Sequence, residues 1–355
     1  MNADAATIPP TRRATLRVPA GVRLPGEPEM SLALDVHWPP SLPQRPLVWV
    51  CLPGGAMNRH YFDLIPPRER GGGDLIPPRA DGGDAAAQTP EAQDDSYSFA
   101  RQMTARGFVV VALDPLGVGD SHRPADGYAL TPEVVSRANA AATERVLAAL
   151  RAGHLDAGLP PLPGLVALGL GHSMGAMLTV LQQAEFRTYR GIALLGFSTR
   201  GLPEYLPPAA RALADDPAVL RARLPELARA QFVDPYPVLR PSPRDSAIYG
   251  GETAEAAGIL ALKRARDRLL PVPAFASMLP GNVAAEAARI DVPVFLGLGE
   301  RDMAGPPHEI PAAFPASQEV SLCVLPEAGH AHFLFASRTR LFARLAQWAN
   351  TMVLD

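Results

Sequence analysis

Six stretches of this sequence are almost entirely apolar, and each is followed within a few residues by glycine or an acidic side chain. Unbroken apolar runs of this length are typical of strands buried on both faces of a parallel sheet. The runs are PLVWVCL (46–52), FVVVAL (108–113), LVALGL (165–170), GIALLGF (191–197), VPVFLGL (292–298) and SLCVL (321–325). A further strand is predicted at SLALDVHW (31–38), paired with ATLRV (14–18).

Between these runs lie segments with the spacing of amphipathic helices, at 96–107, 131–153, 176–186 and 333–353. The second begins with Thr and Pro, which are favoured at the N-cap and first position of a helix. Strands that alternate with helices, and that are apolar throughout, indicate an α/β fold. We therefore expect a mostly parallel central sheet flanked by helices.

Two regions interrupt this alternation. Residues 199–288 are rich in Ala, Arg, Leu and Pro and contain no convincing strand, so we expect an inserted helical cap there. In 63–95 the hexapeptide DLIPPR occurs twice within a Pro-, Gly- and Asp-rich stretch, which favours a flexible loop insertion. The expected organisation is a core of residues 1–198 and 289–355 with a cap of 199–288.

Composition excludes several classes of protein. The chain has 355 residues, 47% of them hydrophobic, and a formal net charge of −3, so no nucleic-acid partner and no membrane surface is expected. No apolar stretch approaches the length of a membrane span, and the N-terminal residues do not resemble a secretion signal. Cys51 and Cys323 each lie in an apolar run, which favours reduced thiols and a cytoplasmic location. No Cys or His spacing matches a metal site, and the oligomeric state is left open.

The stretch GLGHSMGA (169–176) places Ser173 among small residues directly after a predicted strand. A strand that turns sharply into a helix leaves no room for side chains two residues before and after the turn, which explains Gly171 and Gly175. The serine would then project from a strained turn at a helix N-terminus. A packing turn remains the alternative, because a match to G-x-S-x-G arises by chance.

An acid and a histidine follow in the order that a serine nucleophile needs. Glu300 and Asp302 come just after the strand at 292–298, and His330 and His332 just after the strand at 321–325. The carboxyl ends of parallel strands meet at one edge of a sheet, so these groups can converge on Ser173. We expect Asp302 and His330 to be the acid and the base. His332 is expected to pack or to lie at the pocket rim.

The chemistry assigns a role to each group. His330 accepts the proton of Ser173 and returns it to the leaving group, and Asp302 orients the imidazole and stabilises its charged form. A tetrahedral intermediate needs two donors for its oxyanion. We expect one to be the backbone N–H of Met174, and the other to come from the loop PGGA that follows the strand at 46–52.

Together, the strand ends, the GHSMG turn, the acid loop and the histidine loop resemble the serine α/β-hydrolase superfamily, in its broad esterase- and lipase-like group. The resemblance implies an α/β-hydrolase fold with a helical cap insertion. Many members carry His-Gly where this chain has Pro53-Gly54, so the second oxyanion donor is either Gly55 or Ala56. Epoxide hydrolases and haloalkane dehalogenases of the superfamily use an aspartate nucleophile, which argues against both.

The expected function is hydrolysis of a carboxylic ester, lactone or thioester through an acyl-enzyme intermediate. The alternatives are a carbon–carbon bond hydrolase or lyase on the same triad, and a non-catalytic hydrolase fold that binds a ligand. The expected substrate is a small ester-like molecule with an apolar portion, and no cofactor is required. The substrate-binding residues remain unknown from the sequence.

Overall fold

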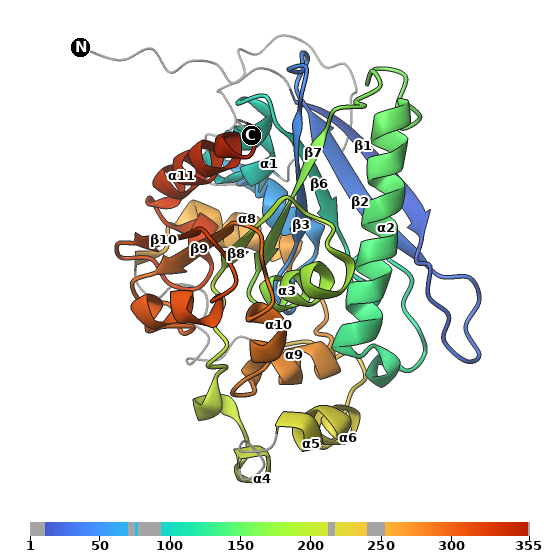
Figure 1. Ribbon diagram of the computed structural model, residues 1–355, viewed down its shortest axis with the longest axis vertical. Helices are drawn as coiled ribbons and strands as arrows, with labels where there is room; N and C mark the ends of the chain where they lie inside the picture. The colour runs from blue at the N-terminus through green and yellow to red at the C-terminus, as the bar shows by residue number, and fades with distance from the viewer. Residues whose placement is uncertain (1–10, 70–74, 77–93, 212–216, 240–252, 354–355) are drawn as a thin grey trace.

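An eight-stranded sheet forms the centre of the protein in a computed structural model that describes residues 11–69, 75–76, 94–211, 217–239 and 253–353. Figure 1 shows helices on both sides of this sheet. The strands are β1 (Arg12–Pro19), β2 (Ser31–Trp38), β3 (Leu47–Leu52), β6 (Val109–Leu113), β7 (Val166–His172), β8 (Gly191–Leu195), β9 (Val294–Gly299) and β10 (Val320–Leu325). Each apolar run of the sequence is a strand, as predicted.

The strand order in the sheet is β1-β2-β6-β3-β7-β8-β9-β10. β1 pairs antiparallel with β2, and β2 pairs antiparallel with β6. Every pair from β6 to β10 is parallel. The sheet is therefore mostly parallel, and the carboxyl ends of β7, β9 and β10 lie at the same edge.

Alternate residues of the central strands pack on opposite faces of the sheet. Val48, Val50 and Leu52 of β3 belong to one cluster of buried apolar side chains, whereas Leu47, Trp49 and Cys51 belong to another. This alternation follows from the two-residue repeat of a strand. Because both sets are buried, the run is apolar throughout.

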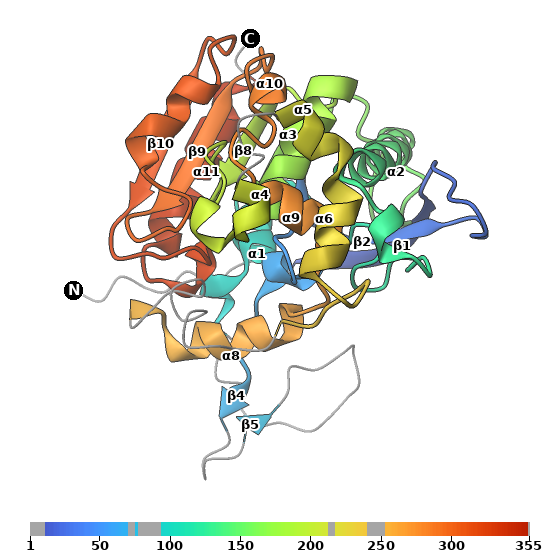
Figure 2. The same ribbon diagram turned by 90° about the horizontal axis from the view of Figure 1, so that it is seen from below.

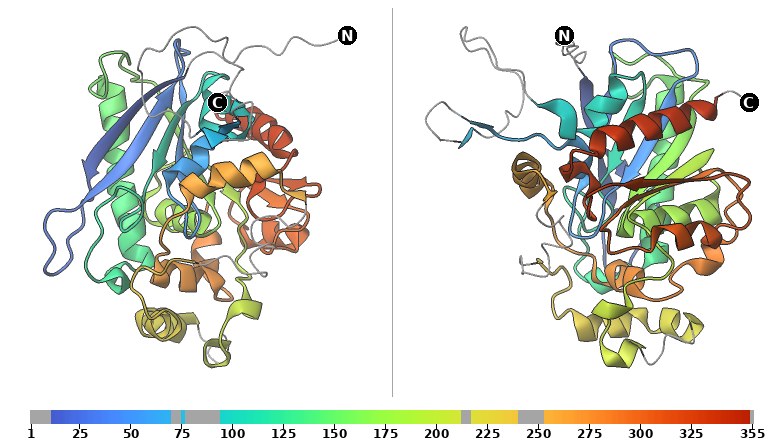
Figure 3. Two further views of the ribbon diagram at one scale, coloured as in Figure 1. Left: turned by 180° about the vertical axis from the view of Figure 1, so that it is seen from behind. Right: turned by 90° about the vertical axis from the view of Figure 1, so that its left-hand side faces the viewer.

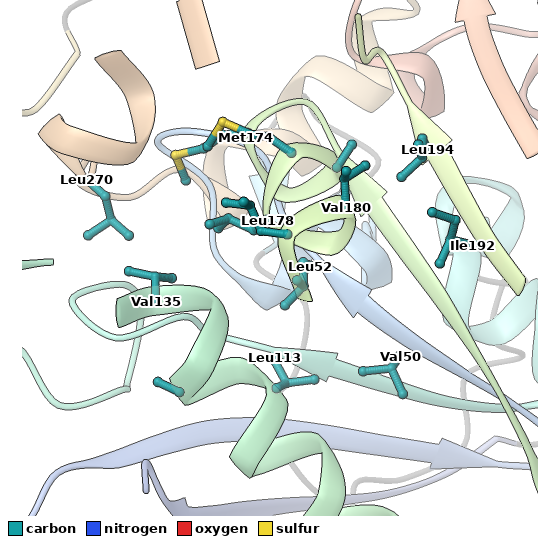
Figure 4. Packing of buried hydrophobic residues seen from close by; sticks show 14 of the residues in the cluster. Val50, Leu52, Leu113, Val135, Met174, Leu178, Val180, Ile192, Leu194 and Leu270 are labelled. Atoms are coloured by element: carbon teal, nitrogen blue, oxygen red, sulfur yellow. The ribbon is translucent and has the colours of Figure 1, made fainter. Parts of the chain in front are cut away.

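Four helices cover the two faces. α2 (Pro132–Ala152) and α3 (Met174–Phe186) pack on the first cluster, and α1 (Phe99–Thr104) and α11 (Arg338–Thr351) pack on the second. Figure 4 shows the first cluster from close by, with Val135 of α2 and Leu178 of α3 among the labelled side chains. The core is thus two apolar layers separated by the sheet.

Two helices are shorter than the sequence predicts. α1 begins at Phe99, because the hydroxyl of Ser98 caps it by accepting a hydrogen bond from the N–H of Arg101 at 3.1 Å. α11 begins at Arg338 rather than at 333. The residues before it, His332–Leu334, form a separate 3-10 turn whose three side chains are buried.

The chain between β8 and β9 is helical in its described part, and Figure 2 shows that it separates into two regions. α4 (Pro208–Arg211), α5 (Pro217–Ala222), α6 (Leu224–Gln231), α9 (Pro271–Met278) and α10 (Ala284–Ala287) gather below the sheet in the view of Figure 1. α8 (Ala256–Ala265) instead lies across the rear of the molecule, as the left panel of Figure 3 shows.

Most of the loop insertion expected at 63–95 lies outside the described residues. Within it, β4 (Arg68–Glu69) and β5 (Leu75–Ile76) form a two-stranded antiparallel pair. The flexibility expected of this segment stays a prediction. Among the helices that the structure describes, none has the length and apolar character needed to cross a membrane.

Candidate active site

Ser173 lies at a sharp turn between β7 and α3. Its backbone has φ 54° and ψ −121°, a conformation that residues other than glycine rarely adopt. A Cβ on Gly171 would lie 2.4 Å from the carbonyl oxygen of Gly175, and a Cβ on Gly175 would lie 2.3 Å from the carbonyl oxygen of Leu52. Both glycines are therefore needed for the turn, as the sequence suggested.

Three side chains form a continuous chain of hydrogen bonds at this edge of the sheet. Nε2 of His330 lies 2.8 Å from Oγ of Ser173. Nδ1 of the same ring lies 2.7 Å from Oδ1 of Asp302. Asp302 follows β9 and His330 follows β10, so the structure brings together the three residues that the sequence selected.

The environment keeps Asp302 ionised. Burial by itself raises the pKa of this carboxyl, but the charges and hydrogen bonds of His330 and His332 lower it more, so its pKa lies well below the ordinary value. A permanently charged carboxylate beside Nδ1 favours the tautomer in which Nδ1 carries the proton and Nε2 is free to accept one. This is the tautomer that a base for Ser173 requires.

Of the two places expected for His332, the structure shows packing in the interior and not the pocket rim. Its side chain is fully buried, and Nε2 lies 2.9 Å from Oδ2 of Asp302. The N–H of Gly299 also lies 3.1 Å from this nitrogen. Nε2 cannot both donate to the carboxylate and accept from Gly299, and the charge-assisted bond to Asp302 is the stronger of the two. His332 thus holds the oxygen of Asp302 that His330 leaves free.

His172 connects the serine turn to the histidine loop. Its Nε2–H donates to the backbone carbonyl of His330 at 2.8 Å, and its ring stacks on Tyr61 with centroids 4.7 Å apart. Burial, followed by the charges of His330 and His332, lowers its pKa well below the ordinary value, so this ring stays neutral. Sequence reasoning missed this contact, although His172 directly precedes the serine.

Gly196 was also missed by sequence reasoning. It follows β8 directly, has φ 61°, and a Cβ there would lie 2.8 Å from Cε1 of His330. A glycine after an apolar strand at the same sheet edge is the signal that could have identified it. Any larger residue would displace the imidazole from Ser173.

The loop after β3 lies against the serine turn. A Cβ on Gly54 would come within 3.3 Å of Cβ of Ser173, and one on Gly55 within 4.0 Å of Cβ of Met174. Met174 is the first residue of α3, so its backbone N–H has no carbonyl one turn earlier to bond. Ala56 adopts a left-handed conformation with φ 57°, and its carbonyl accepts a hydrogen bond from Asp267. The backbone of Gly55 thus lies beside the first residue of α3.

Glu300, the alternative acid, lies on the surface. It is exposed and accepts a hydrogen bond from the backbone N–H of Glu327 at 3.1 Å. In the described part of the chain, no group of three or more His, Cys, Asp or Glu side chains has an arrangement that could hold a metal ion.

Arg59 and His60 lie near the glycine-rich loop, and neither lines the cavity at Ser173. Arg59 is buried and forms ion pairs with Asp35 at 3.0 Å, with Asp120 at 2.8 Å and with Asp114. Burial and the neighbouring Arg59 charge lower the pKa of His60 to about 4. Arg59 therefore joins the end of the glycine-rich loop to β2 and to the turn after β6 through these ion pairs.

A cavity opens beside Ser173 and His330. Residues of the insertion line its other side, among them Leu202, Ser277 and Asn282. A second cavity adjoins it, because Met177 and Asn282 line both. The nucleophile therefore faces a space between the sheet edge and the insertion.

Comparison with known families gives one match, to a family described as the alpha/beta hydrolase family, over residues 49–345. Comparison with curated proteins gives no match. Among solved structures, a hypothetical protein from Pseudomonas aeruginosa is 15% identical with a TM-score of 0.58, over 97% of this chain and 94% of that one.

Two further solved structures have related folds. The peroxisomal alpha-beta-hydrolase Lpx1 from Saccharomyces cerevisiae is 13% identical with a TM-score of 0.58, over 97% of this chain and 88% of that one. A monoacylglycerol lipase from Paleococcus ferrophilus is 17% identical with a TM-score of 0.55, over 91% and 99%. At these identities the likeness shows the fold alone.

Proposed function

This chain belongs to the alpha/beta hydrolase family, and from that premise we propose that it is a serine hydrolase that cleaves a carboxylic ester. The observation that carries the proposal is the unbroken chain of hydrogen bonds from Ser173 through His330 to Asp302. Lactones and thioesters react by the same chemistry and fall within the proposal.

The geometry accounts for each step of ester cleavage. His330 Nε2 removes the proton from Ser173 as Oγ attacks the ester carbonyl, and a tetrahedral intermediate forms. The intermediate collapses to an acyl-enzyme while His330 gives its proton to the departing alcohol oxygen. A water molecule then loses a proton to His330 as it attacks the acyl carbon. When the bond between this carbon and Oγ breaks, His330 returns the proton to Oγ, which releases the acid and restores Ser173. Asp302 stabilises the imidazolium at each stage.

The oxyanion of the tetrahedral intermediate would bind the backbone N–H groups of Met174 and Gly55. Met174 begins α3, so the positive end of that helix also faces the developing charge. Gly55 supports close approach, because a residue without a side chain leaves its N–H open to the substrate oxygen.

The substrate would carry an apolar portion. The second cavity is lined mainly by apolar side chains, including Leu220, Leu224 and Leu279. Among the described residues that line it, the charged one is Arg221, which is paired with Glu133 at 3.1 Å and with Glu286 at 2.7 Å and so offers little attraction for an anionic substrate. We therefore favour an uncharged acyl chain in this space.

Chain length should control the rate with aryl esters. A buried methylene contributes about 0.8 kcal/mol, so kcat/KM is expected to rise about fourfold per methylene until the cavity is full. Leu224→Trp should flatten this series and leave acetate turnover unchanged. Leu239→Trp, at an exposed position in the same insertion, is the matched control. A steep series in Leu224→Trp would contradict this placement of the chain.

His332 should also contribute to the rate. A hydrogen bond to a charged group contributes about 1.5–3 kcal/mol, so His332→Ala is expected to lower kcat by about 10- to 100-fold. His332→Asn keeps an N–H donor and should retain more activity. Both are measured with one activated ester, next to thermal unfolding of each variant. Full activity in His332→Ala would show that Asp302 keeps its orientation towards His330 without the hydrogen bond from His332.

A fluorophosphonate probe tests the proposal directly. Intact-mass analysis should show one adduct, and peptide mapping should place it on Ser173. Turnover of aryl esters of varied acyl length would then separate an esterase from the alternatives. Labelling without any ester turnover would favour a carbon–carbon bond hydrolase or lyase, and no labelling would favour a non-catalytic ligand-binding protein.

We further propose that residues 199–288 act as a cap on a core of residues 1–198 and 289–355. Insertion residues between these bounds line both cavities, which supports the division. A cytoplasmic location is proposed because Cys51 and Cys323 are both buried and free.

A further inference from the structure

The segment Ala265–Leu269 of the insertion runs along the glycine-rich loop that follows β3. Met57 and Arg266 form an antiparallel bridge. On either side of it, the N–H of Asn58 donates to the carbonyl of Ala265 at 2.8 Å, and the N–H of Asp267 donates to the carbonyl of Ala56 at 2.8 Å. The insertion is therefore bonded to the loop that carries Gly55.

The carboxylate of Asp267 adds further bonds. Its Oδ2 accepts from the side-chain amide of Asn58 at 3.1 Å and from the backbone N–H of Gly119 at 3.0 Å. Its Oδ1 accepts from the N–H of Arg268 at 2.7 Å, and only 13% of the side chain is exposed. One carboxylate thus joins the glycine-rich loop, the turn after β6 and the insertion.

The glycine-rich loop needs such support for a physical reason. Gly54 and Gly55 have no side chains that could anchor them, and Ala56 is held in a left-handed conformation with φ 57°. A strained turn persists only where its surroundings determine it. Leu269 supplies one contact, because its Cδ1 lies 3.0 Å from the point that a Cβ of Gly55 would occupy.

We propose that Asp267 is a positioning residue for the oxyanion hole. Its carboxylate holds the glycine-rich loop so that the N–H of Gly55 points at the oxyanion of the tetrahedral intermediate. This inference rests on the proposed function of the Ser173 site. Asp267 acts through Ala56 and Asn58 and does not line the cavity at Ser173. It makes the insertion part of the catalytic geometry as well as a cover for the substrate.

A misplaced oxyanion donor should slow the reaction without weakening substrate binding, because the donor meets full charge only in the transition state. Asp267→Ala is therefore expected to lower kcat by about 10- to 100-fold, with KM within threefold of the native value. Inhibition by phenylboronic acid, which forms a tetrahedral adduct with a serine, should weaken by a similar factor. Asp267→Asn keeps one acceptor oxygen and should recover most of kcat.

Hydrogen exchange supplies a measurement that does not depend on turnover. In Asp267→Ala the peptide spanning 53–58 should exchange faster, while peptides of β7 and β9 stay protected. Asp234→Ala is the matched control, because Asp234 lies in the same insertion, is exposed and accepts a local hydrogen bond from the backbone N–H of Tyr236. It should change neither kcat nor exchange.

Three results would overturn the inference. Unchanged exchange at 53–58 in Asp267→Ala would show that the carboxylate does not hold the loop. Unchanged kcat together with faster exchange would show that the loop does not position the oxyanion donor. A raised KM with unchanged kcat would show a role in substrate binding. If the native protein neither reacts with the fluorophosphonate probe nor cleaves an ester, the proposed function fails, whereas faster exchange at 53–58 would still show that Asp267 holds the loop.

Discussion

Ser173→Ala is expected to abolish ester turnover, with a loss on the order of 10⁴-fold or more in kcat. The substitution removes only the hydroxyl group, which is hydrogen-bonded to Nε2 of His330 in the structure. Alanine keeps the Cβ, so the strained backbone at φ 54° is neither relieved nor worsened. The fold should therefore survive, and thermal unfolding should change little.

The measurement is turnover of an activated aryl ester by purified Ser173→Ala, together with its reaction with the fluorophosphonate probe. The native protein carried through the same purification is the reference. Near-native turnover by the variant would remove the proposed mechanism. Residual labelling elsewhere on the chain would point to a different nucleophile.

The second large effect is expected from the pair formed by Asp302 and His330. His330→Ala removes the base, and Asp302→Asn replaces the acceptor of the Nδ1 proton by an amide that can stabilise the wrong tautomer. Each of these two substitutions should lower kcat by about 10⁴-fold. Glu300→Gln is the matched control for the acid, because Glu300 is exposed and its carboxylate accepts a hydrogen bond from the backbone N–H of Glu327, away from His330.

The acid dependence of stability offers an independent test of Asp302. Its pKa is held well below the ordinary value, so the ionised carboxylate stabilises the folded state at all pH values above the unfolded pKa. That stabilisation is lost as pH falls from the ordinary pKa of aspartate towards the depressed one. Asp302→Asn should therefore unfold with a weaker dependence on pH in that acidic range. An unchanged dependence would mean that Asp302 is not held ionised by its two histidines.

Much of the fold could be predicted from local pattern. The apolar runs became strands because a strand that is buried on both faces has no position for a polar side chain, as β3 shows with Trp49 and Val50 on opposite faces. Helix ends were less predictable. A terminus depends on single hydrogen bonds, such as that between Ser98 and Arg101, which periodicity does not show.

The candidate site divides in the same way. The turn at Ser173 and the need for its flanking glycines could be predicted from the local sequence, because the steric demands of a sharp turn act within a few residues. Asp302 and His330 followed from the topology of a parallel sheet, in which the carboxyl ends of β7, β9 and β10 share an edge. Topology does not separate Asp302 from Glu300, because both lie on one loop; the hydrogen bond between Asp302 and His330 does.

The sequence by itself determined the strands, the serine turn and the order of nucleophile, acid and base. Only the tertiary structure decided that His332 holds the second oxygen of Asp302, and that Asp267 bonds to Asn58 across 209 positions of the chain. His332 could be noticed in the sequence as the second histidine of its loop, but its bond to Asp302 could not, and Asp267 does not stand out among the loop aspartates. His332 has its role because the fold places its ring N–H opposite the Asp302 carboxylate, and Asp267 because the fold places its carboxylate opposite the N–H groups of Asn58 and Gly119. Both pairings depend on packing between segments that are distant in the sequence.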